Sequence, residues 1–131
     1  SALELARTST LSFVGLGDAS PKGTMVSLGY LTPEEMADVR ARGAVGEILM
    51  RYFGKDGRPI GTLLDEQVIG LGWDDICRIP TLVVVAAGPR KVEPICGILR
   101  SGLCNCLITD SDTAEMVLAD VEKEAHREPA E

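Results

Sequence analysis

The chain has 131 residues, of which 45% are hydrophobic and 25% are charged, and its formal net charge is −7 at pH 7. This length suits one domain with a real core and is too short for two ordinary domains. No apolar stretch approaches the ~20 residues of a membrane span and no segment has the layout of a signal peptide, so we expect a cytoplasmic chain with no membrane partner. The net negative charge argues against binding of a nucleic-acid backbone by this segment itself. A small anionic ligand remains possible, because one local cluster of Arg or Lys is enough to bind it.

The cysteines do not suggest a metal site. There are four of them and none forms a CxxC pair: Cys77, Cys96, Cys104 and Cys106. The single histidine, His126, lies in a charged tail. Zinc sites use closely spaced Cys and His ligands, so we expect no metal. We interpret the cysteines as small, buried, apolar side chains in a reducing cytoplasm, with Cys104 and Cys106 on one face of a strand.

Short elements are predicted in the first part of the chain. Residues 3–7 fit the end of a helix, and residues 11–15 fit a short apolar strand that leads into a glycine-containing loop. Thr32 is a typical N-cap and is followed by a proline and two glutamates. This pattern predicts a helix that ends near Arg42.

The middle of the chain leaves more than one assignment open. Apolar residues between positions 43 and 53 fit either a buried strand or a short helix. The Asp-Gly pair within residues 55–59 predicts a tight turn. Residues 68–71 are consistent with a strand, and residues 74–78 with one helical turn before Pro80.

The pattern after Pro80 is regular. Residues 81–87 form an apolar run rich in valine, and residues 89–100 follow with helical spacing of apolar positions. Residues 103–109 fit a second fully buried strand, and residues 110–123 a second helix. Fully apolar strands that alternate with helices predict an α/β fold, with a parallel sheet flanked by helices.

Gly15 and Gly17 follow the first predicted strand. In an α/β fold this position is the carboxyl end of a strand, where ligands bind. The third glycine of a dinucleotide-binding fingerprint is absent, because position 20 is Ser. Two interpretations stay open: a nucleotide-binding loop, and a tight turn that needs glycine for its backbone conformation.

The segment Gly88-Pro89-Arg90-Lys91 lies between a buried strand and a helix. Free N–H groups at a helix N-terminus and the charge of Lys91 would together form an anion site. A lysine in the first turn of a helix is electrostatically unfavourable without an anion, so its position needs a reason. The alternative is a lysine that is simply solvated.

Glu47 closes a Gly-Ala-Val-Gly-Glu run, and Arg51 lies four residues further on. In a helix the two side chains would share one face as an ion pair, a common surface feature. No Ser-His-Asp set, no pair of catalytic carboxylates and no reactive cysteine stands out. We therefore predict no catalytic residue and no cofactor.

Several motifs occur in one order along the chain. They are Val14-Gly15-Leu16-Gly17, Gly29-Tyr30-Leu31, Gly43-Ala44-Val45-Gly46-Glu47, Arg51-Tyr52-Phe53, Asp56-Gly57, Asp74-Asp75-Ile76-Cys77-Arg78-Ile79-Pro80, Ala86-Ala87-Gly88-Pro89-Arg90-Lys91, Leu99-Arg100-Ser101-Gly102 and Leu107-Ile108-Thr109-Asp110-Ser111-Asp112-Thr113-Ala114. In this order and at this separation, they resemble the C-terminal part of the effector domain of SorC-family transcriptional regulators, which are sugar-responsive and mostly bacterial. The resemblance covers residues 3–118.

The resemblance implies a Rossmann-like α/β domain related to glucosamine-phosphate isomerases, ribose-phosphate isomerases and CoA transferases. In that family the domain binds a phosphorylated sugar or polyol and has no catalytic activity. A DNA-binding domain precedes it, and the regulators form homo-oligomers. Residues 1–124 would then be the C-terminal half of the effector domain, with residues 125–131 as a charged tail. The first half, with its own phosphate loop, would lie outside this segment.

The resemblance also implies roles for individual residues. Lys91 would contact polar groups of the ligand, and Glu47 would accept a hydrogen bond from a ligand hydroxyl. Arg51 would lie one helical turn beyond Glu47 in the same site. The loop containing Gly15 and Gly17 would approach the ligand with backbone atoms.

Two departures from the family pattern affect the loop that carries Lys91. Ala87 replaces the usual second glycine before the lysine, and Pro94 lies in the helix that follows. Proline removes a helical hydrogen bond, so we expect it to bend the first turns. An incomplete effector domain would also leave a sheet edge exposed, which predicts pairing with another chain.

An enzyme on the same fold is the alternative function. A sugar-phosphate isomerase would need a general acid or base beside the sugar. Glu47 and Asp56 are the plausible candidates for that role.

Overall fold

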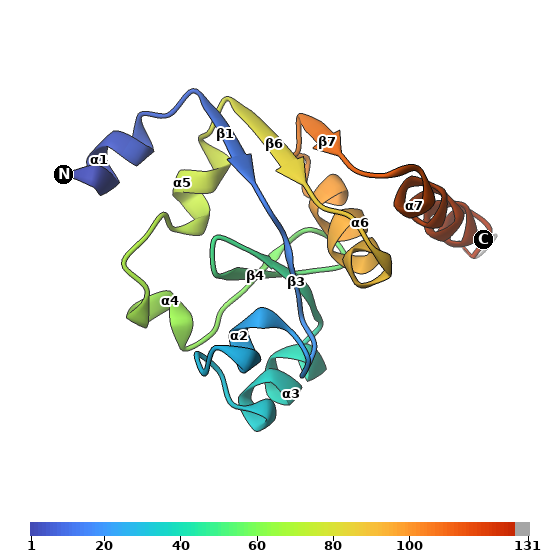
Figure 1. Ribbon diagram of the computed structural model, residues 1–131, viewed down its shortest axis with the longest axis horizontal. Helices are drawn as coiled ribbons and strands as arrows, with labels where there is room; N and C mark the ends of the chain where they lie inside the picture. The colour runs from blue at the N-terminus through green and yellow to red at the C-terminus, as the bar shows by residue number, and fades with distance from the viewer. Residues whose placement is uncertain (128–131) are drawn as a thin grey trace.

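Two small sheets form the framework of the computed structural model, which describes residues 1–127 (Figure 1). The parallel sheet has the order β1-β6-β7. The antiparallel sheet has the order β2-β3-β4-β5. The strands are β1 (Leu11–Val14), β2 (Gly17–Asp18), β3 (Ala44–Ile48), β4 (Arg51–Gly54), β5 (Pro59–Ile60), β6 (Thr81–Val85) and β7 (Cys106–Ile108).

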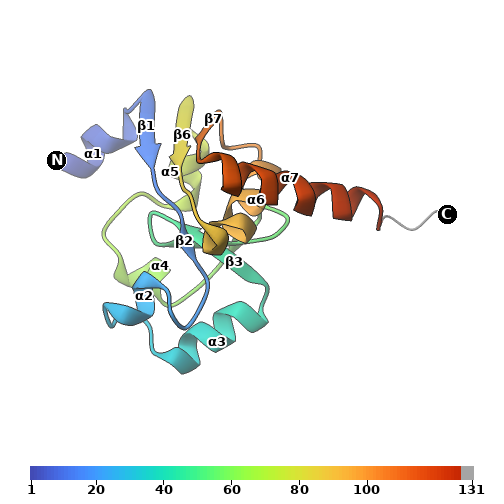
Figure 2. The same cartoon turned by 45° about the vertical axis from the view of Figure 1, so that its right-hand side comes forward.

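The helices flank these sheets. They are α1 (Ala2–Arg7), α2 (Thr24–Ser27), α3 (Pro33–Ala41), α4 (Leu64–Gln67), α5 (Trp73–Cys77), α6 (Val92–Arg100) and α7 (Ser111–Ala125), with a 3₁₀ turn, η1 (Pro89–Lys91), before α6. Helices α6 and α7 pack on each other, and α7 projects away from the rest of the molecule in Figure 2. None of the helices in residues 1–127 is long and apolar enough to cross a bilayer.

Local signals in the sequence account for the elements that were predicted. The Thr32 hydroxyl accepts the Glu35 N–H at 3.1 Å and the Glu35 carboxylate accepts the Thr32 N–H at 2.8 Å, so α3 begins with a capping box. The strand-helix order β6-α6-β7-α7 and the parallel pairing of β6 with β1 and β7 confirm the predicted α/β fold. Helix α7 runs through Ala125, one residue past the predicted domain boundary, and residues 128–131 of the predicted tail lie outside the described residues.

The core consists of two clusters. The first lies between the parallel sheet, α6 and the β3-β4 hairpin, and contains Val14, Leu16, Ile48, Phe53, Ile76, Leu82, Val84, Ala86, Ile95, Cys96, Ile98 and Val117. The second lies between the hairpin and helices α2 and α3, and contains Ala19, Met25, Leu31, Met36, Val39, Ala44, Tyr52 and Leu64. The hairpin therefore has a buried face on each side.

Two strand predictions were wrong. Residues 68–71 form a connection between α4 and α5, and Ile69 there is 95% exposed. The strand predicted over residues 103–109 is shorter and is not fully buried, because β7 pairs with β6 alone and is an edge strand of the described chain. The burial predicted for the cysteines holds for Cys96, whereas Cys77 and Cys106 are exposed.

Pro94 does not cost α6 a hydrogen bond. It is the third residue of the helix, among the first four amides, which have no acceptor within the helix. The bend expected there is replaced by the 3₁₀ turn that precedes α6 and carries Lys91. Pro94 instead packs against Gly46, where an added Cβ would lie 2.7 Å from the proline ring.

Candidate functional site

The candidate site lies where the parallel strands β1 and β6 end (Figure 1). Strand β1 leads into the Gly15–Gly17 loop, and β6 leads into the Gly88–Lys91 loop. The carboxyl ends of parallel strands share one edge of the sheet, so the two loops are neighbours, and this edge is the usual ligand position in α/β folds. The first turn of α7 packs against the second loop, because the Gly88 N–H donates to the Thr113 hydroxyl at 2.8 Å.

The two glycines of the first loop do not form a tight turn. Neither Gly15 nor Gly17 has a positive φ, so that interpretation was wrong. A Cβ on Gly15 would meet the Val85 carbonyl oxygen at 3.9 Å, an ordinary contact. A Cβ on Gly17 would overlap the carboxylate of Glu47. Gly17 therefore leaves the space that the Glu47 side chain occupies.

Glu47 lies opposite Gly17 in the pairing of β2 with β3. Its Oε2 accepts the backbone N–H of Met50 at 2.7 Å. Burial raises the pKa of Glu47, against the opposing effects of the Met50 N–H and the positive charge of Lys91. The carboxylate thus has a structural role at the hairpin turn and is also close to Lys91.

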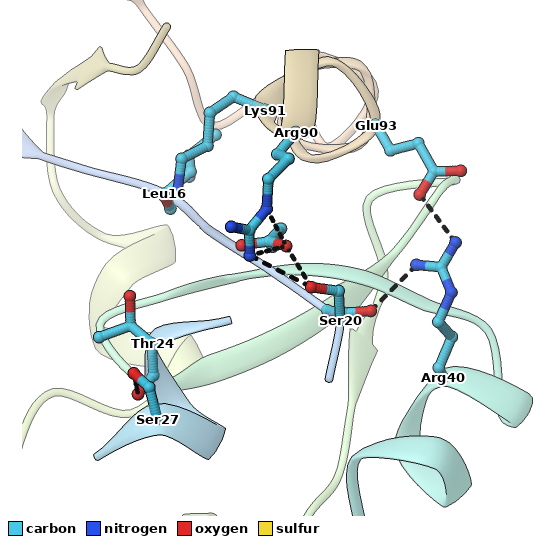
Figure 3. A network of polar contacts seen from close by, with 10 residues as sticks. Leu16, Ser20, Thr24, Ser27, Arg40, Arg90, Lys91 and Glu93 are labelled. Atoms are coloured by element: carbon cyan, nitrogen blue, oxygen red, sulfur yellow. Dashed lines mark hydrogen bonds and ion pairs between the residues drawn. The ribbon is translucent and has the colours of Figure 1, made fainter. Parts of the chain in front are cut away.

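Lys91 reaches the same place from the other loop. Its Nζ donates a hydrogen bond to the carbonyl oxygen of Leu16, between the two glycines (Figure 3). The structure therefore brings together four of the five predicted site residues: Gly15, Gly17, Glu47 and Lys91. At this sheet edge the Lys91 cation can contact an anionic group, and the Glu47 carboxylate can accept hydrogen bonds from hydroxyls.

The amides of the Gly88–Lys91 loop are less available than predicted. The Gly88 N–H is taken by Thr113, the Lys91 N–H donates to the Gly88 carbonyl at 3.0 Å, and Pro89 has none. Anion binding at this loop therefore depends mainly on the Lys91 side chain.

Arg51 is not part of this group, and its predicted helical pairing with Glu47 was wrong. Residues 44–54 form a hairpin whose two-residue turn, Leu49-Met50, has φ values of 49° and 66°. Glu47 pairs with Tyr52, and Arg51 pairs with Ile48 on the opposite face.

The Arg51 side chain is buried in a different environment. Its Nε donates to the Leu71 carbonyl at 3.0 Å, and its Nη1 donates to Oδ1 of Asp65 at 3.1 Å. It lines a hollow of about 430 Å³ with Asp65 and Trp73. Arg51 therefore ties the hairpin to α4 and to the segment before α5.

Sequence reasoning missed an ionic network beside the site (Figure 3). Oδ2 of Asp18 accepts from Nε and Nη2 of Arg90 at 3.1 and 2.9 Å, and from the Ser20 hydroxyl at 2.6 Å. Burial opposes the charge of Asp18, but the hydrogen bonds from Ser20 and Arg90 outweigh it and lower the pKa. Arg40 donates to the Ala19 carbonyl at 3.0 Å. The sequence offered one signal for this network: Asp18 directly follows Gly17, and Arg90 directly precedes Lys91.

This network borders a hollow of about 460 Å³, whose lining includes Asp18, Arg40 and Arg90. Asp56, the other acid/base candidate, does not line this hollow. Asp56 lies in the β4-β5 turn, where Oδ1 accepts the Arg58 N–H at 3.0 Å. Within residues 1–127, no three Cys, His, Asp or Glu side chains converge as a metal site would require.

Replacing Gly17 with Ala should displace the Glu47 carboxylate from the Met50 N–H. The added methyl group overlaps the flexible end of Glu47, so we expect the backbone to stay and the hydrogen bond to be lost, at about 1–3 kcal/mol. Hydrogen exchange should show faster exchange of the Met50 amide. Gly61→Ala is the control, because its nearest contact is 3.7 Å away. Unchanged protection of Met50 would contradict the prediction.

Known proteins resemble this chain over most of its length. A family model described as "Putative sugar-binding domain" matches residues 1–119. The transcriptional regulator LsrR of Klebsiella pneumoniae is 33% identical over 117 residues, which cover 87% of this chain and 36% of LsrR.

Solved structures agree with this match. The sugar-binding domain of a transcriptional repressor from Vibrio fischeri is 36% identical, with a TM-score of 0.79 over 92% of this chain and 48% of that one. The full-length sorbitol operon regulator SorC from Klebsiella pneumoniae is 27% identical, with a TM-score of 0.78 over 88% of this chain and 37% of that one. The chain thus spans between 36% and 48% of the length of these three relatives.

Proposed function

The chain belongs to this family of sugar-binding domains, as the resemblance predicted, and from that premise we propose that it is the effector-binding part of a bacterial transcriptional regulator. The effector is a phosphorylated sugar or polyol. Its binding modulates DNA binding, through a domain outside this segment, and the assembly of a cytoplasmic homo-oligomer. The chain itself catalyses no reaction.

The observation that carries this proposal is that the Lys91 and Glu47 side chains both reach the Gly15–Gly17 loop, Lys91 at the Leu16 carbonyl and Glu47 over Gly17. A lysine can contact a ligand anion, and a carboxylate can accept hydrogen bonds from sugar hydroxyls. Gly15, beside which only the Val85 carbonyl oxygen lies within 4 Å of an added Cβ, lets a ligand approach the backbone closely, whereas Gly17 makes room for Glu47. Asp56 lies in the β4-β5 turn, and Asp18, the carboxylate beside Glu47, is engaged by Ser20 and Arg90, which supports binding over isomerisation.

Calorimetry of the full-length regulator against a panel of pentose, hexose and polyol phosphates tests the proposal. We expect one member of the panel to bind and to change the affinity for operator DNA. Binding by no member would count against a sugar-phosphate effector. Isomerase turnover that is lost in Glu47→Gln would show that the protein is an enzyme instead.

A further inference from the structure

Tyr52 is a fully buried tyrosine whose hydroxyl has no hydrogen-bond partner. It lies on β4, its side chain is 1% exposed, and its ring packs in the second core cluster. Within residues 1–127 the Tyr52 hydroxyl is one of two buried side-chain polar atoms without a partner; the other is the Thr109 hydroxyl. Buried polar groups in native proteins are almost always paired, so this hydroxyl calls for an explanation.

Two carboxylates lie near this hydroxyl. Glu47 is the cross-strand partner of Tyr52 in the β3-β4 hairpin, and such partners project from the same face of the sheet. Burial raises the pKa of Tyr52, and the negative charges of Glu47 and Asp18 raise it further. The phenol is therefore a protonated donor at neutral pH.

The two carboxylates differ in their place relative to Tyr52, because Glu47 is its cross-strand partner whereas Asp18 pairs with Gly46. Asp18 already accepts three hydrogen bonds at Oδ2, from Ser20 and from two nitrogens of Arg90. Glu47 accepts one bond, from the Met50 N–H to Oε2. Its Oε1, which lies over Gly17, makes no hydrogen bond within residues 1–127. The unpaired donor and the unpaired acceptor are thus on facing residues of one hairpin.

We propose that Tyr52 is a positioning residue for Glu47, whose hydroxyl donates to Oε1 and holds the carboxylate toward the ligand. The inference rests on the proposed role of Glu47 as an acceptor for a ligand hydroxyl. A carboxylate oxygen has two lone pairs, so Oε1 can accept from Tyr52 and from the ligand at once. Tyr52 itself lies beside Glu47, in the second core cluster, and touches no ligand.

Titration of Glu47 by carboxyl ¹³C NMR tests the hydrogen bond without any ligand. The groups that face Glu47 are Lys91, Asp18, the Met50 N–H and Tyr52. A donor to the charged carboxylate lowers its pKa, so Tyr52→Phe should raise the already elevated pKa of Glu47 further, by about 0.5 or more. The other tyrosine of the chain, Tyr30, is 54% exposed, and Tyr30→Phe is the matched control.

Tyr52→Phe keeps the aromatic ring in the core, so we expect it to fold. Its near-ultraviolet circular dichroism and thermal unfolding establish this before the titration. A folded variant with the Glu47 titration of the unaltered chain would overturn the proposal. If the variant does not fold, Glu47→Gln in the unaltered core gives the second measurement: the ring resonances of Tyr52 should shift, and unchanged resonances would overturn the proposal.

Ligand binding is the second arm and uses the full-length regulator with the panel member that binds best. Tyr52→Phe should weaken this binding about 3- to 10-fold at pH 7, as expected for one hydrogen bond, and Tyr30→Phe should not. Because a raised pKa makes Glu47 neutral at a higher pH, the loss of affinity on acidification should also begin at a higher pH. Unchanged affinity and pH dependence would overturn the positioning role. If no sugar phosphate binds, the proposed function fails, whereas the NMR titration still decides whether Tyr52 holds Glu47.

Discussion

Replacing Lys91 with Ala is expected to weaken binding of the proposed sugar phosphate by about 1.5–3 kcal/mol, about 10- to 150-fold. Lys91 holds the Gly15–Gly17 loop through the Leu16 carbonyl and is the cation nearest to Glu47 on this loop. The Gly88 and Lys91 amides are engaged internally and Arg90 is paired with Asp18, so the Lys91 side chain is the cation of this loop that has no ion pair within residues 1–127. Calorimetry of the full-length regulator measures the effect.

A matched control separates a local effect from a general change in charge. Lys55 is an exposed lysine in the β4-β5 turn, where its carbonyl accepts a hydrogen bond from Arg100 near the end of α6 at 3.2 Å. Lys55→Ala removes the same charge and should leave the affinity unchanged. Equal affinities of the Lys91→Ala variant and the unaltered protein would remove Lys91 from the site.

Replacing Gly57 with Ala should destabilise the chain by about 2–5 kcal/mol. Gly57 has a φ of +80°, where a residue with a Cβ costs about 1–2 kcal/mol. The added Cβ would also lie 2.5 Å from Cα of Ser101, a backbone atom that cannot move alone, and overpacking of this kind costs about 1–3 kcal/mol more. Denaturant unfolding measures the sum.

Gly29 is the matched control for the predicted effect of Gly57→Ala. Its φ is also +80°, but nothing lies within 4 Å of a Cβ there. Gly29→Ala should therefore cost about 1–2 kcal/mol, the conformational part alone. If both variants lost the same free energy of unfolding, the close approach of the β4-β5 turn to the end of α6 would add nothing to the cost of Gly57→Ala.

Local sequence patterns predicted some residues of the site correctly and failed for others. Gly15, Gly17 and Lys91 were predicted because each follows a recognisable strand, and the carboxyl edge of a parallel sheet collects such loops. The pairing of Glu47 with Arg51 failed because nothing near Leu49 and Met50 indicates a reversal. Two-residue hairpin turns favour Asn-Gly or Asp-Gly, and here two residues with side chains adopt positive φ. The Glu47 carboxylate, by accepting the Met50 N–H, helps to hold that turn.

The ionic network could not be predicted either, because its residues are far apart in the sequence. Asp18 and Arg90 are 72 positions apart, and each is an ordinary charged residue in its own loop. Their pairing exists because β1 and β6 lie side by side in parallel, so that the loops after them meet. The burial of Tyr52 likewise depends on α2 and α3 covering one face of the hairpin.

The sequence by itself determined the features that depend on neighbours in the chain: the capped start of α3 at Thr32, the Asp56-Gly57 turn, and the alternation of apolar strands and helices after Pro80. These follow from backbone hydrogen bonding and apolar periodicity within a few residues. Only the tertiary structure decided which side chains meet. Strand register placed Glu47 with Tyr52 and turned Arg51 to the other face, because a shift of one residue along a strand reverses the face on which a side chain lies.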